Sequence, residues 1–167
     1  MRLVIRSGGQ SGADRAALDA AIALDIEYTG WCPHGGIAED HPSPPGLLAR
    51  YPRLVETPST EPEQRTAWNV RDSHATLALV RGNSLEISRG TAFTVRCAEL
   101  IFLRPYRVVD LDEGSSAETT RNWLLRLADN DDATQFVLNV AGPRESELPG
   151  IYERSLTFLS HLFRELM

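Results

Sequence analysis

A glycine-rich turn near the start of the chain has the residue types and spacing of an anion-binding loop. The turn contains Gly8, Gly9, Gln10, Ser11 and Gly12, and it lies between a short β-branched run and an alanine-rich helical pattern. Glycines allow backbone conformations and close approaches that a Cβ would block. The helix that follows directs its free N–H groups and the positive end of its dipole toward the turn. This arrangement favours the binding of a phosphate or another anion.

An architectural role for these glycines is the alternative. Their spacing is neither the G-x-G-x-x-G of dinucleotide-binding loops nor that of the phosphate loop, in which a lysine follows the last glycine. Ser11 could cap the helix, with Asp14 three residues later in a capping box. If a ligand binds here, the Asp14 carboxylate would repel a bare phosphate. The ligand would then also offer hydroxyls, amides or a metal.

Two later segments carry similar chemistry. Gly90 and Thr91 stand at a predicted helix start, where a flexible residue, a capping hydroxyl and free N–H groups favour an anion. Asn139 lies inside an apolar strand pattern and must find polar partners. After that strand, Arg144 could hold an anion and Glu145 could activate a water molecule. The alternative for Arg144 and Glu145 is an ion pair that orders the loop.

A long loop supplies further candidates. The stretch from residue 32 to 45 has no periodicity and is rich in glycine, proline and polar residues, as functional or disordered loops are. Trp31 and His34 could line a pocket there, or the loop could be a surface excursion with a half-buried Trp31. Asn69, next to Trp68 on a predicted helix, is another pocket candidate.

The elements that must position these groups alternate along the chain. Strands are predicted at residues 3–6, 54–57, 75–80, 106–111 and 136–141, and helices at 14–24, from an N-cap at Thr60 to about 73, after Gly90, at 116–128 with a break at 130–132, and at 149–166. Such alternation predicts an α/β fold, a mostly parallel sheet with helices on both faces in three layers, in one domain over 1–167. The glycine turns after strands 3–6, 75–80 and 136–141 would then gather at the carboxyl edge, where such sheets bind ligands.

Composition excludes several classes of protein. The formal net charge of −6 argues against a nucleic-acid partner, which requires a basic face. No apolar run approaches the roughly 20 residues that span a bilayer, and no signal peptide opens the chain, so no membrane partner is expected. Cys32 and Cys97 lie far apart, which favours reduced thiols in a cytoplasmic protein over a disulfide or a metal site.

The opening of the chain resembles that of the molybdenum-cofactor carrier family, whose pattern S-G-G-Q-T-G-x-D-R-A-A-L-D matches residues 7–19. That family is the circularly permuted YpsA-like branch of the SLOG superfamily, Rossmann-like proteins related to lysine-decarboxylase-like phosphoribohydrolases. The resemblance continues through 30–33, 38–40, 64–73, 90–92 and 139–146, and so covers almost the whole chain. Three positions depart from the pattern: Ser11 replaces threonine, His34 replaces lysine and Arg89 replaces glycine.

The resemblance implies a Rossmann-like fold and a homo-oligomer, a dimer or tetramer. It also implies a small phosphorylated ligand, either the molybdenum cofactor or a nucleotide. We therefore expect a binding or carrier protein rather than an enzyme. The alternative is a nucleotide sensor or a nucleotide N-glycosidase that uses Glu145 or Asp14. The ligand-binding candidates are Gly8, Gly9, Gln10, Ser11, Gly12, Asp14, Arg15, Trp31, His34, Asn69, Arg89, Gly90, Thr91, Asn139, Gly142, Pro143, Arg144, Glu145 and Ser146, with no metal ligands among them.

Overall fold

A six-stranded parallel sheet forms the centre of the molecule. The computed structural model describes residues 2–114, 116–129 and 133–167. The strands are β1 (Arg2–Arg6), β2 (Glu27–Cys32), β3 (Leu54–Glu56), β4 (Ala75–Val80), β5 (Tyr106–Asp110) and β6 (Gln135–Ala141). Their order is β3-β2-β1-β6-β4-β5, and all neighbours pair in parallel. The predicted α/β, Rossmann-like class is confirmed.

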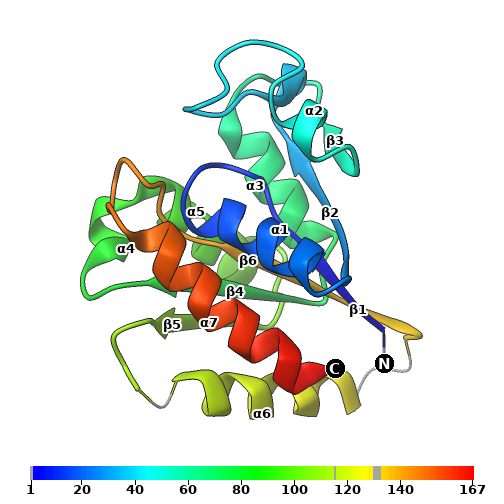
Figure 1. Ribbon diagram of the computed structural model, residues 1–167, viewed down its shortest axis with the longest axis vertical. Coiled ribbons are helices and arrows are strands. Elements are labelled where there is room, and N and C mark those ends of the chain that lie inside the picture. The colour runs from blue at the N-terminus through cyan, green and yellow to red at the C-terminus, as the bar shows by residue number, and fades with distance from the viewer. Residues whose placement is uncertain (1, 115, 130–132) are drawn as a thin grey trace.

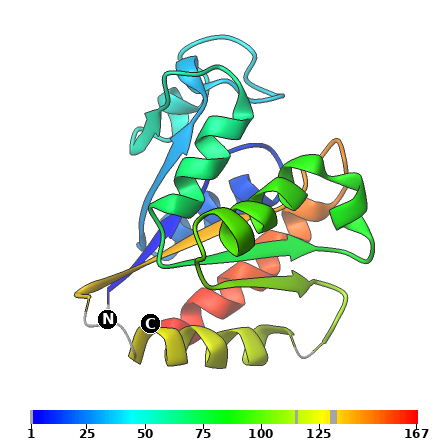
Figure 2. The same cartoon turned by 180° about the vertical axis from the view of Figure 1, so that it is seen from behind.

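Helices cover the sheet on both faces. They are α1 (Ala13–Ala23), α2 (Leu47–Arg50), α3 (Pro62–Arg71), α4 (Ser84–Ile87), α5 (Arg89–Arg96), α6 (Ser116–Asp129) and α7 (Ile151–Leu166), with a 3-10 turn η1 (His34–Gly36) and a π-helical turn η2 (Cys97–Ile101). Helices α1 and α7 lie together in front of the sheet in Figure 1, and α3 and α5 lie behind it, as the reverse view in Figure 2 shows. The three predicted layers are therefore present.

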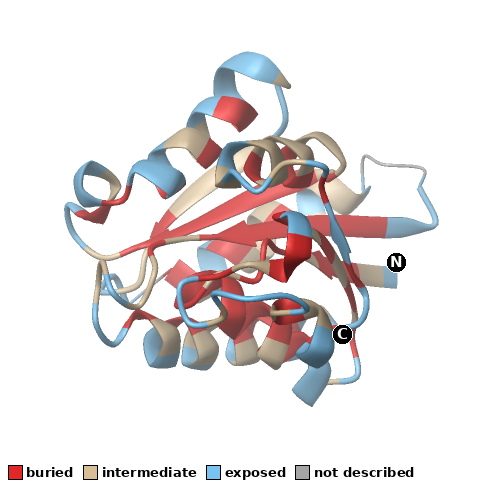
Figure 3. Ribbon diagram, turned by 90° about the horizontal axis from the view of Figure 1, so that it is seen from above, coloured by how far each residue is buried: buried red, intermediate tan, exposed pale blue. Residues whose placement is uncertain are grey.

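The core lies where the central strands meet these helices. Every residue of β4 is buried, as its continuous apolar pattern predicts for a strand covered on both faces. Ala17, Ala20 and Ala21 of α1 are fully buried, and their small side chains let this helix approach the sheet and α7 closely. Figure 3 shows buried strands in the middle and exposed outer surfaces on the helices.

Three local predictions need correction. Strand β2 was not predicted, because Gly30 and its polar neighbours interrupt the apolar signal. The N-cap of α3 is Glu61 rather than Thr60, since the helix begins at Pro62. The N-cap of α1 is Gly12, with no side-chain cap, because Ser11 directs its hydroxyl to Glu39 instead. The predicted helix break at 130–132 lies outside the described residues.

The register sets the ends of β1, β6 and β4 along one edge of the sheet. Arg6, the last residue of β1, aligns with Asn139 on β6, and Ala141, the last residue of β6, aligns with Ala78 on β4. Strand β4 continues to Val80, so the three strands end in steps at the same edge. No helix in the described part of the chain is long and apolar enough to cross a bilayer.

Candidate functional site

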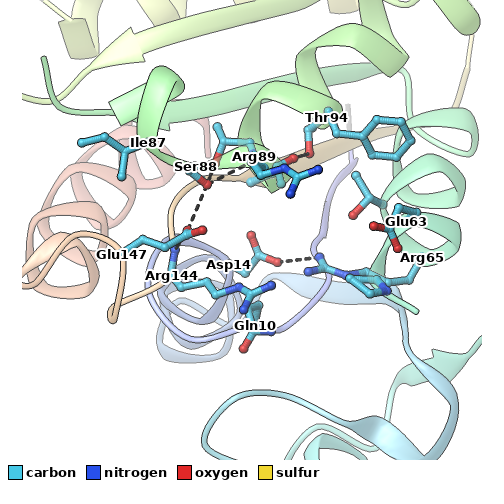
Figure 4. A pocket seen from close by; sticks show the side chains of 17 residues that line it. Gln10, Asp14, Glu63, Arg65, Ile87, Ser88, Arg89, Thr94, Arg144 and Glu147 are labelled. Atoms are coloured by element: carbon cyan, nitrogen blue, oxygen red, sulfur yellow. Dashed lines mark hydrogen bonds and ion pairs between the residues drawn. The ribbon is translucent and has the colours of Figure 1, made fainter. Parts of the chain in front are cut away.

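A cavity of about 500 Å³ lies above these three strand ends (Figure 4). It brings together the β1–α1 turn, the first turns of α3, the segment that enters α5, and the loop after β6. The lining consists of Gln10, Asp14, Pro62, Glu63, Arg65, Thr66, Ile87, Ser88, Arg89, Gly90, Thr91, Phe93, Thr94, Ala141, Gly142, Arg144 and Glu147. Four separate stretches of sequence thus form one site at the carboxyl edge of the sheet.

Three arginines from different elements face this cavity. Arg65 comes from α3, Arg89 from the start of α5 and Arg144 from the loop after β6. Among the described residues, Arg89 and Arg144 form no ion pair. Arg65 donates from Nη1 to Asp14 Oδ2 at 3.0 Å, while its buried Nε has no partner in the described part of the chain. The cavity therefore offers guanidinium groups that are free to bind an anion.

Asp14 is the buried acid of the site. Its side chain is 4% exposed, and besides Arg65 it accepts hydrogen bonds from the backbone N–H groups of Gln10 and Gly142. Burial raises the pKa of Asp14 above its usual value, although the Arg65 guanidinium opposes that shift. In Figure 4 the carboxylate lies between Arg65 and Arg144.

The start of α5 forms another wall. Ser88 caps the helix by accepting a hydrogen bond from the Thr91 N–H at 3.3 Å, so the capping hydroxyl predicted at Gly90–Thr91 is in fact that of Ser88. The Ser88 hydroxyl also donates to Glu147 Oε2 at 2.9 Å, and the same oxygen accepts the Arg144 N–H at 2.9 Å. Glu147 therefore links the Arg144 loop to the N-terminus of α5.

The glycines of the first turn make room for protein groups. A Cβ on Gly8 would lie 1.9 Å from Arg65 Nη1, so Arg65 occupies the space above the turn. Gly12 has φ +80°, and a Cβ there would lie 2.3 Å from the Pro143 carbonyl oxygen. That oxygen accepts the Ala13 N–H at 3.2 Å. The N-terminus of α1 is thus partly satisfied by the loop after β6.

A hydrogen-bond network behind the cavity ties three loops together. Glu39 accepts hydrogen bonds from the hydroxyls of Ser11 and Ser146, the latter at 2.5 Å. Gln10 Oε1 accepts the N–H groups of Ser11 and Glu39, each at 3.0 Å. Glu145 accepts the N–H groups at the start of α7 and does not line the cavity. Apart from Gln10, which also lines the cavity, these groups hold the walls in place rather than face the cavity.

Several predicted site residues have partners elsewhere. Arg15 forms a bidentate ion pair with Asp40, with both distances 2.9 Å, and its Nε donates to the Gly9 carbonyl. His34 is exposed and contacts Glu56 at 3.4 Å. Neither Arg15 nor His34 lines the cavity.

The predicted amides and tryptophan also serve the scaffold. Asn69 exchanges two hydrogen bonds with the backbone of Trp31, which holds α3 to β2. The Trp31 indole N–H donates to Asp72 at 2.8 Å. Asn139 finds the partner that its buried position requires in Thr76, at 3.3 Å.

The structure therefore divides the candidate residues into two groups. Those that line the cavity are Gln10, Asp14, Arg89, Gly90, Thr91, Gly142 and Arg144. Those that do not line it are Gly8, Gly9, Ser11, Gly12, Arg15, Trp31, His34, Asn69, Asn139, Pro143, Glu145 and Ser146. Sequence reasoning missed Arg65 and Glu147 as site residues. Arg65 stands in the matched stretch 64–73, but only the packing of α3 beside the glycine turn reveals its role.

The donor set of the cavity suits an oxyanion. Guanidinium groups and backbone N–H groups bind phosphate and similar anions through charge-assisted hydrogen bonds. No group of three or more His, Cys, Asp or Glu side chains in residues 2–114, 116–129 and 133–167 could hold a metal ion.

Comparisons with known proteins agree with this fold. The model of the circularly permutated YpsA SLOG family matches residues 5–163. The chain is also similar to a protein from Syntrophus aciditrophicus, described as a "Putative molybdenum carrier protein", whose crystal structure was determined at 1.45 Å. The two chains are 35% identical with a TM-score of 0.77, and the match covers 98% of this chain and 94% of the other. No curated protein matches the chain.

Proposed function

The chain belongs to the circularly permutated YpsA SLOG family, and from this premise we propose that it is a small-molecule carrier. Its ligand is a phosphate-bearing pterin or a nucleotide-like molecule, held in the cavity above β1, β6 and β4. The description of the related structure as a molybdenum carrier supports the molybdenum cofactor as the cargo.

The observation that carries this proposal is the set of arginines that face one cavity. The whole chain has a formal charge of −6, yet Arg89 and Arg144 meet here without an ion pair among the described residues. Like charges that share a site repel one another, and a bound anion relieves that repulsion. The N–H groups at the start of α5 add further donors for an anion.

The rest of the lining suits a flat ring. Pro62, Ile87 and Phe93 supply apolar surface on the side of α3 and α5. Ile87 is 51% exposed, which leaves its side chain available to cover a ligand. A volume of about 500 Å³ lies within the range of about 300–1,000 Å³ that small-molecule sites span. A ring against this side would place its phosphate near Arg89 and Arg144.

The molybdenum cofactor fits this donor set through its phosphate and its pterin. Among the described lining residues there is no cysteine or histidine, the side chains that most readily bond a soft metal. The protein would therefore hold the cofactor by its organic part and leave the metal without a side-chain ligand. Such a mode suits a carrier, which must release its cargo.

We extend the proposal to a cytoplasmic homo-oligomer. Cys32 and Cys97 are free and buried, in keeping with a reducing compartment. Leu100, Ile101 and Leu103 are 65%, 53% and 79% exposed, and they lie next to one another around η2. An apolar stretch of this kind is a reasonable seam between copies of the chain.

Native mass spectrometry of the purified protein tests the proposal, followed by denaturation to identify any released molecule. We expect a pterin phosphate or a nucleotide near one per chain. Arg89→Ala and Arg144→Ala should each lower the affinity for that molecule at least tenfold, because each removes charge-assisted hydrogen bonds. Arg164→Ala, at an exposed position of α7 away from the cavity, is the matched control. Wild-type protein that binds neither pterins nor nucleotides would contradict the proposal.

One observation also favours a hydrolytic alternative. Asp14 is a buried carboxyl group on the cavity wall, and general acids and bases occupy such places. Glu145, the other candidate, has both carboxylate oxygens engaged at the start of α7. Release of a free base from a bound nucleotide by wild-type protein, abolished by Asp14→Asn, would establish this activity.

A further inference from the structure

Asp14 poses an electrostatic problem for any anion that enters the cavity. The lining contains three basic side chains and three acidic ones. These are Arg65, Arg89 and Arg144, and Asp14, Glu63 and Glu147, so the formal charge of the lining is zero when all six are ionised. An anion that binds near Arg144 also comes close to the Asp14 carboxylate (Figure 4). Because the Asp14 carboxylate is buried, water screens this repulsion poorly.

Protonation of Asp14 is the change that removes this repulsion with least disturbance. Glu63 is exposed, so water screens its charge. Glu147 is already bound to the Ser88 hydroxyl and the Arg144 N–H, both of which donate to its carboxylate. The Asp14 side chain, by contrast, is 4% exposed, and burial already favours its neutral form.

The surroundings of Asp14 allow that change. Arg65 of α3 is the charge that acts most strongly on it. Helix α5 contributes Arg89, the loop after β6 contributes Arg144 and Glu147, and α3 also contributes Glu63. On α1 itself, Arg15 is paired with Asp40.

Helix α7, which packs on α1, directs Tyr152 to Asp19. The ion pair with Arg65 is therefore the single one that Asp14 forms among the described residues.

Arg65 is placed to exchange partners. Its Nη1 holds Asp14, and its buried Nε has no partner among the described residues. Once Asp14 is neutral, the guanidinium can turn its charge to the ligand, while the Asp14 O–H becomes a donor to an anion.

We infer that Asp14 takes up a proton when an anion enters the cavity, so that loading and release of the ligand are coupled to pH. The inference rests on the proposed function, since it needs an anion in this site. The bound anion favours the neutral carboxyl group, and the affinity falls as pH rises. Between the Asp14 pKa of the empty protein and that of the loaded protein, the dissociation constant should rise by about tenfold per pH unit. The coupling would favour release of cargo at higher pH.

Sulfate is a suitable probe because its charge is constant across the range from pH 5 to 9. Its affinity for the wild-type protein can be measured by NMR titration of the Gly90 and Gly142 amides. A pH-stat in unbuffered solution records the protons taken up. We expect an affinity that falls with pH, and an uptake that approaches one proton per bound sulfate.

Two variants test whether Asp14 is the residue that takes up the proton. Asp14→Asn keeps the size of the side chain and has no carboxyl group to protonate, so it should bind sulfate at pH 8 at least as tightly as wild type does at pH 6, without proton uptake. Glu63→Gln removes the same charge from the exposed rim and should leave the uptake unchanged. The wild-type measurement stands on its own should Asp14→Asn fail to fold.

The outcomes separate the two proposals. Sulfate that binds in the cavity with no pH dependence and no proton uptake would overturn the inference alone. Proton uptake that persists in Asp14→Asn would also overturn it. Failure of sulfate to bind to wild type at any pH in this range would count against the anion site itself, and with it against the proposed function.

Discussion

At the scale of single residues, Arg15 and Asp40 join the first helix to the long loop between β2 and β3. The Nη1 and Nη2 atoms of Arg15 both donate to the Asp40 carboxylate, which also lies 3.0 Å from His41 Nδ1. Asp40 is 46% exposed while Arg15 is nearly buried. The Arg15 guanidinium, as hydrogen-bond donor and as charge, holds the pKa of Asp40 well below its usual range.

This pair predicts a pH-dependent contribution to stability. Since the folded-state pKa is the lower one, the contribution is complete above the unfolded-state value of about 4 and is lost as pH falls toward the folded-state value. With allowance for solvent screening, Asp40→Asn should cost about 1 kcal/mol of unfolding free energy at pH 7 and less at pH 3. Urea unfolding at pH 7, 5 and 3 checks this.

Glu86→Gln, which alters an exposed carboxylate with no ion pair among the described residues, is the control. A cost for Asp40→Asn that stays constant between pH 7 and pH 3 would contradict the assignment.

Sequence alone could identify some site residues but not others. Asp14 and Arg144 stand in short glycine-containing segments, where a local pattern points to the end of a strand. Arg65 stands on a regular helix, and nothing local distinguishes it from a solvated arginine. Its role arises because α3 packs beside the Gly8 turn, which is a tertiary contact that periodicity does not encode.

At the scale of elements, Glu145 sets the start of α7. Its two carboxylate oxygens accept the Gly150 and Tyr152 N–H groups, the latter at 3.0 Å. A carboxylate at a helix N-terminus satisfies free donors and complements the dipole. Glu145→Ala should therefore lower the unfolding free energy by about 1 kcal/mol, as loss of an N-cap does, and leave ligand affinity within a factor of about two.

Thermal unfolding and a ligand titration check this expectation. Glu153→Ala, in the first turn of the same helix, is a matched loss of a carboxylate and should cost less. Loss of ligand turnover in Glu145→Ala with unchanged stability would instead assign Glu145 a catalytic role.

Gly12 decides how closely α1 meets the loop after β6. Its φ is positive, and a Cβ on this residue would lie only 2.3 Å from the Pro143 carbonyl oxygen, so there is no space for a side chain. Gly12→Ala should cost roughly 3 kcal/mol through backbone strain and a forced shift of the loop. Gly90→Ala, at a helical position with open space around it, should leave stability unchanged or raise it by roughly 0.5 kcal/mol. Chemical denaturation compares the two, and equal costs would refute this interpretation.

The elements most visible in the sequence are those whose burial is uniform. Strand β4 reads as a continuous apolar run because both of its faces are covered. Strand β2 contains Gly30, where a Cβ would lie 1.9 Å from the Ser7 carbonyl oxygen, so close packing of β1 and β2 excludes the very side chain that would have signalled a strand. Helix caps were harder to predict: the hydroxyl of Ser11, a candidate cap, binds another loop, whereas the cap of α5 is Ser88, two residues before the predicted Gly90.

At the scale of the whole molecule, the apolar stretch around η2 bears on assembly. If Leu100, Ile101 and Leu103 form the seam of a homo-oligomer, Leu103→Asp should shift the mass in solution to that of a monomer, because a charge in an apolar interface is costly. Light scattering coupled to size-exclusion chromatography measures this. Ile87→Asp, at a position that is 51% exposed but on the cavity side, is the control and should leave the assembly state unchanged. A wild-type monomer would contradict the oligomer.

The overall architecture was accessible to sequence reasoning because alternating strands and helices admit few parallel topologies. The order β3-β2-β1-β6-β4-β5 then places the last strand beside the first, and the loops after both meet over α1. The convergence of loops was predictable from this rule. The identity of the groups that fill the space between them was not, since it depends on side-chain packing across those loops.

The pairing of β1 with β6 has a consequence for folding during synthesis on the ribosome. Residues 2–6 are synthesised well before their partners at 135–139. Until then β1 presents an open edge, which is a site for unwanted pairing with other chains. The nascent chain also carries Arg65 and Arg89 before the loop of Arg144 exists. The set of arginines that faces the cavity is therefore complete only once residue 144 has been synthesised.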